Sequence, residues 1–272
     1  MTTSALQSCL ETPSRNDAVA VHLQPDTNVN CAADASESGV ERYYAHCRND
    51  ILAEVPAAAR NILSIGCGAG ATEGELVRAG ARVVGIEMNP SAAAAARRRG
   101  LVVIEGDAGA ASAKLADERF DCLIYADILE HLTDPVAVLQ SHVGLLEPGG
   151  TVIISVPNFR YHAVARDLFL KGHVRYTDSG IFDRTHVRMT TCRMVEEWLG
   201  LVGLVRTGLN YRIAMRRERM LNAVSLGVLR EFLARQVIVV ATKEDRSRRC
   251  VMPSADAATS FEDAVRAVRH AR

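Results

Sequence analysis

Three glycines at alternate positions, Gly66, Gly68 and Gly70, predict a ligand site in this 272-residue chain. They follow a short apolar run, residues 62–65, that predicts a buried strand, and they precede a predicted helix over 71–79. Because glycine has no Cβ, the backbone can turn sharply here and come close to a ligand. A strand, a glycine loop and a helix N-terminus in this order are typical of α/β proteins that bind a nucleotide-like cofactor.

Two acidic residues stand where the next predicted strands end. Glu87 closes the strand 82–87, about 20 residues after the loop, where a carboxylate can accept hydrogen bonds from both ribose hydroxyls. Asp107 follows the strand 101–105, where an acid can accept from an adenine amino group. The loop and Glu87 by themselves also fit a dinucleotide fingerprint, which leaves a nicotinamide enzyme open, but the acid after the third strand argues against it.

Histidines and further acids gather in two later segments. Asp127 and His131 follow the predicted strand 120–126, and His186 lies near Asp183 in a polar stretch. Histidine titrates near neutral pH, so His131 and His186 are our candidates for a catalytic base. Asp183 and His186 lack a third ligand at a recognisable spacing, so the sequence predicts no metal site.

Strands and helices alternate through most of the chain, which predicts a parallel sheet covered on both faces. The predicted strands are 61–66, 82–87, 101–105, 120–126, 150–156, 202–210 and 236–242; the predicted helices include 40–55, 71–79, 91–99, 109–117, 134–146, 190–200 and 212–233. We expect a disordered or loosely packed extension over 1–38, a domain over 39–242, and a polar tail over 243–272. Within the domain, 157–189 and 211–233 are expected to be insertions on the acceptor side.

Composition limits the partners and the compartment. The formal net charge is zero, which disfavours a general nucleic-acid binder. No apolar run approaches 18 residues, so we expect no integral membrane segment. The seven cysteines are scattered without Cys-x-x-Cys pairs, which favours free thiols in a reducing cytoplasm.

Taken together, these motifs resemble the class I S-adenosylmethionine-dependent methyltransferases over residues 40–242. The features that carry the resemblance are the glycine loop, the acidic strand ends, the pair Glu130-His131 after the fourth strand, and the turn Pro148-Gly149-Gly150. The resemblance implies an α/β fold: a Rossmann-like, doubly wound, seven-stranded and mostly parallel sheet with an antiparallel last strand. Helices cover both faces, and an insertion follows strand five.

The resemblance also implies which residues bind S-adenosyl-L-methionine. The glycines would pack against its methionine portion and ribose, Glu87 would bind the ribose, and Asp107 the adenine amine. Arg48 would close over the cofactor carboxylate, and Tyr125 would lie where the sheet faces the sulfonium. The full predicted cofactor set is Tyr44, Gly66, Cys67, Gly68, Gly70, Glu87, Met88, Asp107, Ala108, Ala126 and Asp127.

The expected activity is transfer of a methyl group to an O or N atom of a small-molecule acceptor by in-line displacement. The stretch 180–186 resembles, more loosely, a bacterial subgroup found with glycan or natural-product biosynthesis, so a natural-product or sugar-type acceptor is expected. The alternatives are an NAD(P)-dependent oxidoreductase and a catalytically inactive, cofactor-binding regulatory partner. A homodimer is also possible.

Overall fold

A computed structural model describes residues 47–243 of the chain. Tyr44, the predicted extension over 1–38 and nearly all of the predicted tail lie outside the described residues. The predicted helix over 40–55 is therefore described only at its end, where α2 (Asn49–Leu52) forms a single short turn.

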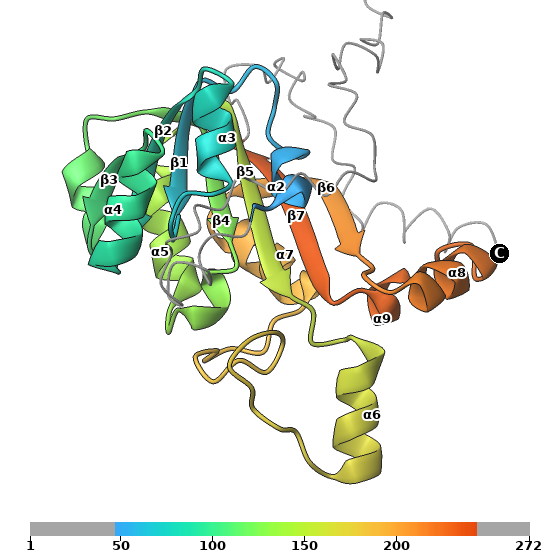
Figure 1. The fold of residues 1–272 in the computed structure, drawn as a ribbon. Helices are drawn as coiled ribbons and strands as arrows, with labels where there is room; N and C mark the ends of the chain where they lie inside the picture. Colours follow the sequence, from blue (N-terminus) through green and yellow to red (C-terminus); the bar gives the residue numbers. More distant parts are fainter. Residues whose placement is uncertain (1–46, 244–272) are drawn as a thin grey trace, which may run out of the picture.

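Seven strands form one sheet in the order β3-β2-β1-β4-β5-β7-β6, as Figure 1 shows. Strands β1 to β5 pair in parallel, and β7 lies antiparallel between β5 and β6. This arrangement confirms the predicted fold class. The strands are β1 (Asn61–Ile65), β2 (Arg82–Glu87), β3 (Val102–Glu105), β4 (Phe120–Ala126), β5 (Leu146–Pro157), β6 (Leu204–Arg212) and β7 (Gln236–Lys243).

The order of the strands creates a crevice between β1 and β4. From β1 the chain continues to β2 and β3 on one side, and it then returns to place β4 on the other side. The connections that follow β1 and β4 therefore leave the sheet in opposite directions. Ligands of open α/β sheets bind at such switch points, outside the carboxyl ends of the strands.

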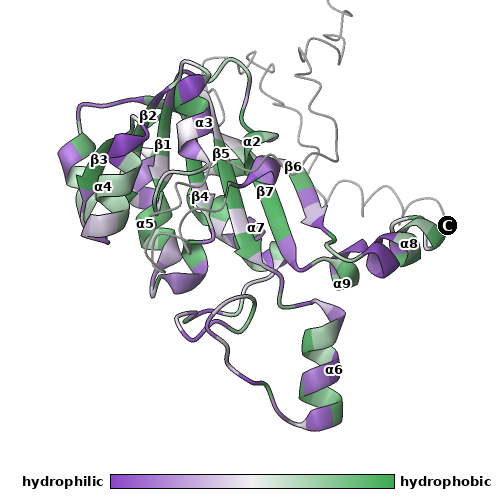
Figure 2. Cartoon of the chain, in the orientation of Figure 1, coloured by the Kyte–Doolittle hydropathy of each residue, from purple (hydrophilic) through white to green (hydrophobic). Residues whose placement is uncertain are grey.

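Two hydrophobic cores, one on each face of the sheet, take alternate residues of the same strands. On β1, Leu63 and Ile65 belong to one core and Ile62 to the other, as expected for side chains that alternate across a strand. Figure 2 shows the central strands as the most hydrophobic part of the chain. The covering helices are α3 (Glu73–Arg78), α4 (Pro90–Arg98), α5 (Pro135–Val143) and α7 (Cys192–Leu201), with the 3-10 helices η1 (Ala110–Leu115) and η2 (Leu129–His131).

Two predicted helices differ from those observed. The segment 109–117 forms the 3-10 helix η1 rather than an α-helix. The segment 212–233 is not one helix: α8 (Arg216–Val224) and α9 (Arg230–Leu233) are separated by a turn. Leu226 and Gly227 adopt positive φ angles of 51° and 81° in that turn, which an α-helix cannot accommodate.

The segment between β5 and α7 leaves the body of the domain. It contains α6 (His162–Lys171), which the sequence did not predict, and a long loop that returns to the sheet (Figure 1). Both α6 and the α8–α9 segment expose large apolar side chains, including Phe169, Leu170 and Leu226. Within residues 47–243, no helix is both long and apolar enough to span a bilayer.

Candidate functional site

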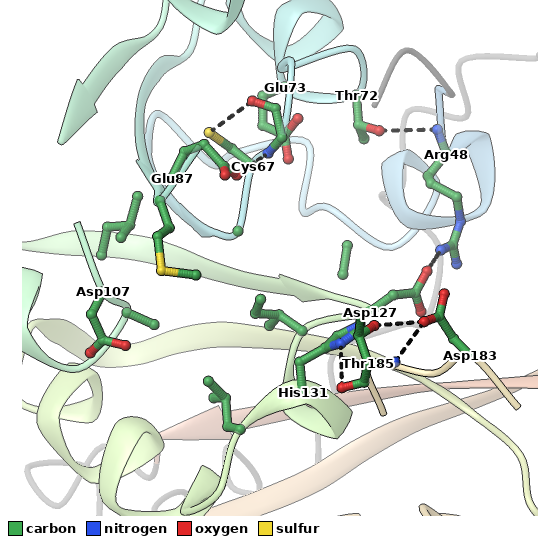
Figure 3. Close-up of a pocket in the computed structure, with 18 of the residues that line it drawn as sticks. Arg48, Cys67, Thr72, Glu73, Glu87, Asp107, Asp127, His131, Asp183 and Thr185 are labelled. Carbon is green, nitrogen blue, oxygen red and sulfur yellow. Dashed lines mark hydrogen bonds and ion pairs between the residues drawn. The ribbon is translucent and has the colours of Figure 1, made fainter. Parts of the chain in front are cut away.

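A cavity of about 1060 Å³ opens where the strand ends meet the glycine loop. It is lined by residues of three strand ends, of the loop after β4, and of the long loop before α7 (Figure 3). Ten of the predicted site residues line it together: Gly66, Cys67, Gly68, Glu87, Met88, Asp107, Ala108, Ala126, Asp127 and His131. Residues from distant parts of the sequence therefore converge at the crevice between β1 and β4.

The first turn of the glycine loop requires a residue without a side chain. Gly66 has a φ of 72°, and a Cβ there would lie 2.9 Å from Cδ1 of Ile128. Gly68 also has a positive φ, of 53°, and lines the cavity. Glycine is thus needed for the backbone path and for the close approach of the loop after β4.

The third glycine and the cysteine between the glycines shape the loop differently. Gly70 is not among the residues that line the cavity, and a Cβ there would meet Cβ of Ala96 in α4 at 3.0 Å. Gly70 therefore allows the loop to pack closely against α4. Cys67 is buried against Gly85 of β2, and burial raises the pKa of its thiol. A thiol in this state acts as a small apolar group in the cavity wall.

The carboxylate of Glu87 lines the cavity and is held in place by two backbone N–H groups. It is 8% exposed and accepts hydrogen bonds from the backbone N–H groups of Gly68, at 2.8 Å, and Asn89, at 2.7 Å. A carboxylate offers about four lone-pair positions, so two remain for ligand hydroxyls. The same bond to Gly68 links the acid to the glycine loop and holds both in a defined relation.

The side chain of Asp107 caps the turn that begins η1. Its Oδ1 accepts from the N–H groups of Gly109, at 2.9 Å, and Ala110, at 3.2 Å, at the start of η1. Asp107 also lines the cavity together with Met88, which is 73% exposed. Capping through one oxygen is compatible with a ligand contact through the other.

Asp127 and Arg48 are held mainly by one another and by the fold. The Arg48 guanidinium forms an ion pair with Asp127 and donates to Oγ of Ser155 at 3.0 Å. Ser155 Oγ and Gln236 Nε2 donate to Asp127 Oδ1 at 2.8 and 3.0 Å. Asp127 has a φ of 56°, which is unfavourable for a residue with a side chain and persists where surrounding contacts fix it. This network joins three strand ends.

Tyr125 does not face the cavity. Its side chain is fully buried in the core, where its hydroxyl lies 3.0 Å from Nδ1 of His142 in α5. The prediction that Tyr125 lies towards the sulfonium was wrong because neighbouring residues of a strand point to opposite faces. Ala126 is the β4 residue that lines the cavity.

His131 and His186 lie side by side although 55 positions separate them. Their ring centroids are 4.7 Å apart in an edge-to-face arrangement. Nδ1 of His131 lies 3.2 Å from the carbonyl oxygen of Thr185, and Nδ1 of His186 lies 3.0 Å from that of Ile181. A carbonyl can only accept, so each Nδ1 carries the proton and each Nε2 keeps its lone pair.

The environment of His131 keeps its imidazole neutral. Burial lowers the pKa of His131, and the neighbouring His186 lowers it further. His131 lines the cavity, whereas His186 is not among the residues that line it. The two candidate bases are therefore one cluster, of which a single member faces the ligand space.

Glu130 belongs to the same cluster and was not among the predicted site residues. It is 1% exposed, and burial raises the pKa of its carboxyl well above the usual range, with the charge of Asp127 adding to the effect. Its Oε1 lies 3.9 Å from Nε2 of His186. The only signal in the sequence was its place beside His131.

The long loop is attached to η2 through the main chain. The carbonyl oxygen of Glu130 accepts from the N–H groups of Val187, at 3.0 Å, and Arg188, at 3.1 Å. Four loop residues then line the cavity: Asp178, Asp183, Arg184 and Thr185. None of the described residues that line the cavity belongs to the predicted insertion over 211–233.

Comparison with known proteins finds similarity over the central part of the chain. Residues 63–154 match the family model described as "Methyltransferase domain". A ubiquinone biosynthesis O-methyltransferase of Cereibacter sphaeroides is 34% identical over 122 residues, which cover 43% of this chain and 49% of that protein. The chain thus matches about half the length of this curated relative.

Solved structures agree with the fold. A possible histamine N-methyltransferase from Thermotoga maritima superposes with a TM-score of 0.53 at 19% identity, covering 75% of this chain and 91% of that one. A methyltransferase from Archaeoglobus fulgidus gives 0.51 at 17% identity, over 69% and 87%. Both are described as S-adenosylmethionine-dependent, and the likeness at these identities concerns the fold.

Proposed function

We propose that this chain, whose residues 63–154 form a class I methyltransferase domain, transfers a methyl group from S-adenosyl-L-methionine to a small molecule. The observation that carries the proposal is the bond between Glu87 and the N–H of Gly68 at the edge of the cavity. This bond holds the carboxylate proposed to bind the ribose, that of Glu87, beside the glycine loop, whose backbone a cofactor can approach closely. Asp107 lies at the next strand end of the same cavity, where an adenine would reach it.

The cofactor supplies an electrophilic methyl group, and the protein contributes position and exclusion of water. Glu87 and the glycine loop would orient the adenosine, while Arg48 and Asp127 form the wall opposite to them (Figure 3). That wall is rigid because Ser155 and Gln236 also hold Asp127. A rigid wall keeps an acceptor in line with the methyl group.

The proposed acceptor atom is an oxygen or a nitrogen of a natural-product or sugar-type molecule. The long loop supports an acceptor pocket, since Asp183, Arg184 and Thr185 line the cavity beside His131. The relative from Cereibacter sphaeroides carries a name for O-methylation. A hydroxyl acceptor must lose a proton, and the free Nε2 of His131, or of His186 beside it, is the proposed proton acceptor.

Calorimetry with S-adenosylhomocysteine and with NAD tests the cofactor assignment. We expect saturable binding of S-adenosylhomocysteine and none of NAD; the reverse result would favour the oxidoreductase alternative. Methyl transfer is then measured with panels of phenols, sugars and amines. Tight cofactor binding without turnover on any panel would favour the inactive regulatory partner.

His131→Ala and His186→Ala test the acceptor side. Each should lower product formation by about 100-fold, a typical contribution of general acid–base catalysis, while S-adenosylhomocysteine affinity changes less than about twofold. Full turnover in both variants would remove the base assignment.

A reducing, cytoplasmic setting and a homodimer remain part of the proposal. Cys67, Cys122 and Cys192 are buried thiols that form no disulfide within the described residues.

A further inference from the structure

Three side chains that can bind a metal ion lie close together: those of Glu130, His131 and His186. Each offers one ligand atom, and the three atoms lie within 4.8 Å of one another. Glu130 and His131 come from η2, and His186 comes from the long loop. The main-chain bonds from Val187 and Arg188 to the Glu130 carbonyl hold the two segments together. The cluster is thus a fixed part of the fold.

Both histidines are oriented as metal-binding histidines are. Each uses Nδ1 on a backbone carbonyl, of Thr185 for His131 and of Ile181 for His186. Such a bond fixes the ring and the tautomer and leaves Nε2 as the ligand atom. In the case of His186, that Nε2 lies 3.9 Å from Oε1 of Glu130.

Glu130 supplies an independent sign that a positively charged partner belongs here. The residue is 1% exposed, and its Oε2 is buried without a hydrogen-bond partner in the described part of the chain. Buried carboxylate oxygens without a partner are costly and uncommon. A cation bound by this carboxylate would supply the charged partner that the buried group lacks.

We infer that Glu130, His131 and His186 bind a divalent transition-metal cation beside the cavity. Two imidazole nitrogens with one carboxylate suit Zn²⁺, Fe²⁺ or Co²⁺ better than Mg²⁺, which prefers oxygen ligands. Three protein ligands leave at least one coordination position open. Sequence spacing could not reveal the site, because 55 positions separate His131 from the loop histidine.

The functional consequence rests on the proposed methyl transfer. A hydroxyl bound to the cation through its oxygen has a lowered pKa and releases its proton to water. The oxygen lone pair then forms the O–CH₃ bond as the S–CH₃ bond breaks, and that electron pair stays on sulfur as a neutral thioether. With the cation bound, both Nε2 atoms serve as ligands and water takes the proton; proton transfer to a histidine, as proposed above, applies to the protein without the cation. Hydroxyl acceptors would therefore be favoured over amines.

The test is a titration of the chelator-treated full chain with Co²⁺, followed by visible absorption, and with Zn²⁺, followed by calorimetry. We expect one site whose spectrum lacks a thiolate charge-transfer band. Glu130→Gln and His186→Ala should each weaken the affinity by at least about 10-fold, the loss found even for outer-shell partners. His173→Ala is the matched control, since His173 lies exposed in the same insertion and should leave the affinity unchanged.

Equal affinity in the wild type, Glu130→Gln and His186→Ala, or no saturable binding at all, would overturn the inference. S-adenosylhomocysteine binding is measured on the same four proteins. Loss of metal binding with intact S-adenosylhomocysteine binding shows that a variant is folded and supports the site. Failure of the wild type to bind S-adenosylhomocysteine would instead reject the proposed function, whatever the metal result.

Discussion

The cofactor side and the acceptor side of the cavity are built in different ways. On one side, Glu87 and Asp107 lie at strand ends and are fixed by backbone N–H groups two to nineteen residues away. On the other side, His131 is fixed by Thr185, 54 residues away. Arg48 and Asp127, which the resemblance assigns to the cofactor, form an ion pair across 79 positions. Figure 3 shows the two groups facing each other across the cavity.

The part of the chain that matches the family model includes both acids of the cofactor side but only part of the acceptor side. The family model covers residues 63–154, which include both acids of the cofactor side and His131. The long loop, with Asp183 and His186, lies beyond it. A site made from strand ends keeps its form wherever the sheet forms, whereas a loop can be exchanged. We therefore expect cofactor binding and acceptor choice to be separable by mutation.

The largest expected effect comes from Glu87→Ala. Removing the carboxylate deletes the proposed ribose contacts and leaves two N–H groups without their acceptor, so S-adenosylhomocysteine affinity should fall by about 100-fold. Glu105→Ala is the control, because Glu105 ends the neighbouring strand but pairs with the exposed Arg97. The S-adenosylhomocysteine affinity of both variants is measured by calorimetry. A similar loss in each would mean that Glu87 acts through the fold.

Acidification tests whether both sides depend on one scaffold. Burial lowers the pKa of His142, beneath β4, from 6.5 to about 4. Between these values the unfolded chain binds more protons than the folded one, so stability is complete above pH 6.5 and falls as the pH drops. We expect His142 to contribute a loss of about 2 kcal/mol between pH 6.5 and 4.5, measured as the difference between the wild type and His142→Gln in urea titrations.

His142→Gln should flatten this dependence, whatever its own stability at pH 7. Trp198, the single tryptophan, lies in α7 and reports on the core by fluorescence, while circular dichroism reports on the whole sheet. Coincident transitions by the two methods would indicate one cooperative unit. Separate transitions would show that the core around Trp198 and the rest of the sheet do not unfold as one unit.

Gly66→Ala should act through crowding on the cofactor side. A Cβ at Gly66 meets Ile128, whereas a Cβ at Gly80 meets nothing within 4 Å, and both glycines have positive φ angles. Each alanine should therefore cost about 1 kcal/mol through its backbone, but Gly66→Ala alone should also lower S-adenosylhomocysteine affinity, by about 10-fold. Adding Ile128→Ala should restore part of that affinity. No recovery would place the effect elsewhere.

The smallest expected effect separates capping from ligand binding at Asp107. Asp107→Ala and Asp134→Ala each remove a cap, of η1 and of α5, and should each cost about 1 kcal/mol of stability. Affinity for S-adenosylhomocysteine should fall by about fivefold for Asp107→Ala alone, the effect of one lost hydrogen bond. Equal affinities would leave Asp107 with only its structural role.

Local patterns predicted where the strand ends that line the cavity lie; their role in cofactor binding stays a prediction. The apolar run before Gly66 and the position of Glu87 depend on nearest neighbours along a strand, and the sheet order followed from the family resemblance. Tyr125 was misplaced because its orientation depends on the face to which one strand position points, and the apolar run from Cys122 to Ala126 does not reveal that face. Gly70 was assigned to the cofactor because spacing does not distinguish a ligand contact from packing on Ala96.

The acceptor side was predictable only as a set of residue types. The sequence named His131 and His186 separately, but it could not show that their rings lie 4.7 Å apart or that the Glu130 carboxylate lies beside them. Those contacts depend on where a long loop returns to the sheet. The break at Leu226 and Gly227 was missed for a similar reason, since nothing nearby in the sequence except one glycine marks the positive φ angles.

The hydrogen bonds from the N–H groups of Val187 and Arg188 to the Glu130 carbonyl have a consequence for how the sequence of the long loop can evolve. Because the loop is anchored there by peptide groups, replacing its side chains would leave the anchor intact. Arg188 reinforces it by donating to the carbonyl oxygen of Leu132 at 3.1 Å. New acceptor preferences could thus arise by point mutation in a loop that stays docked.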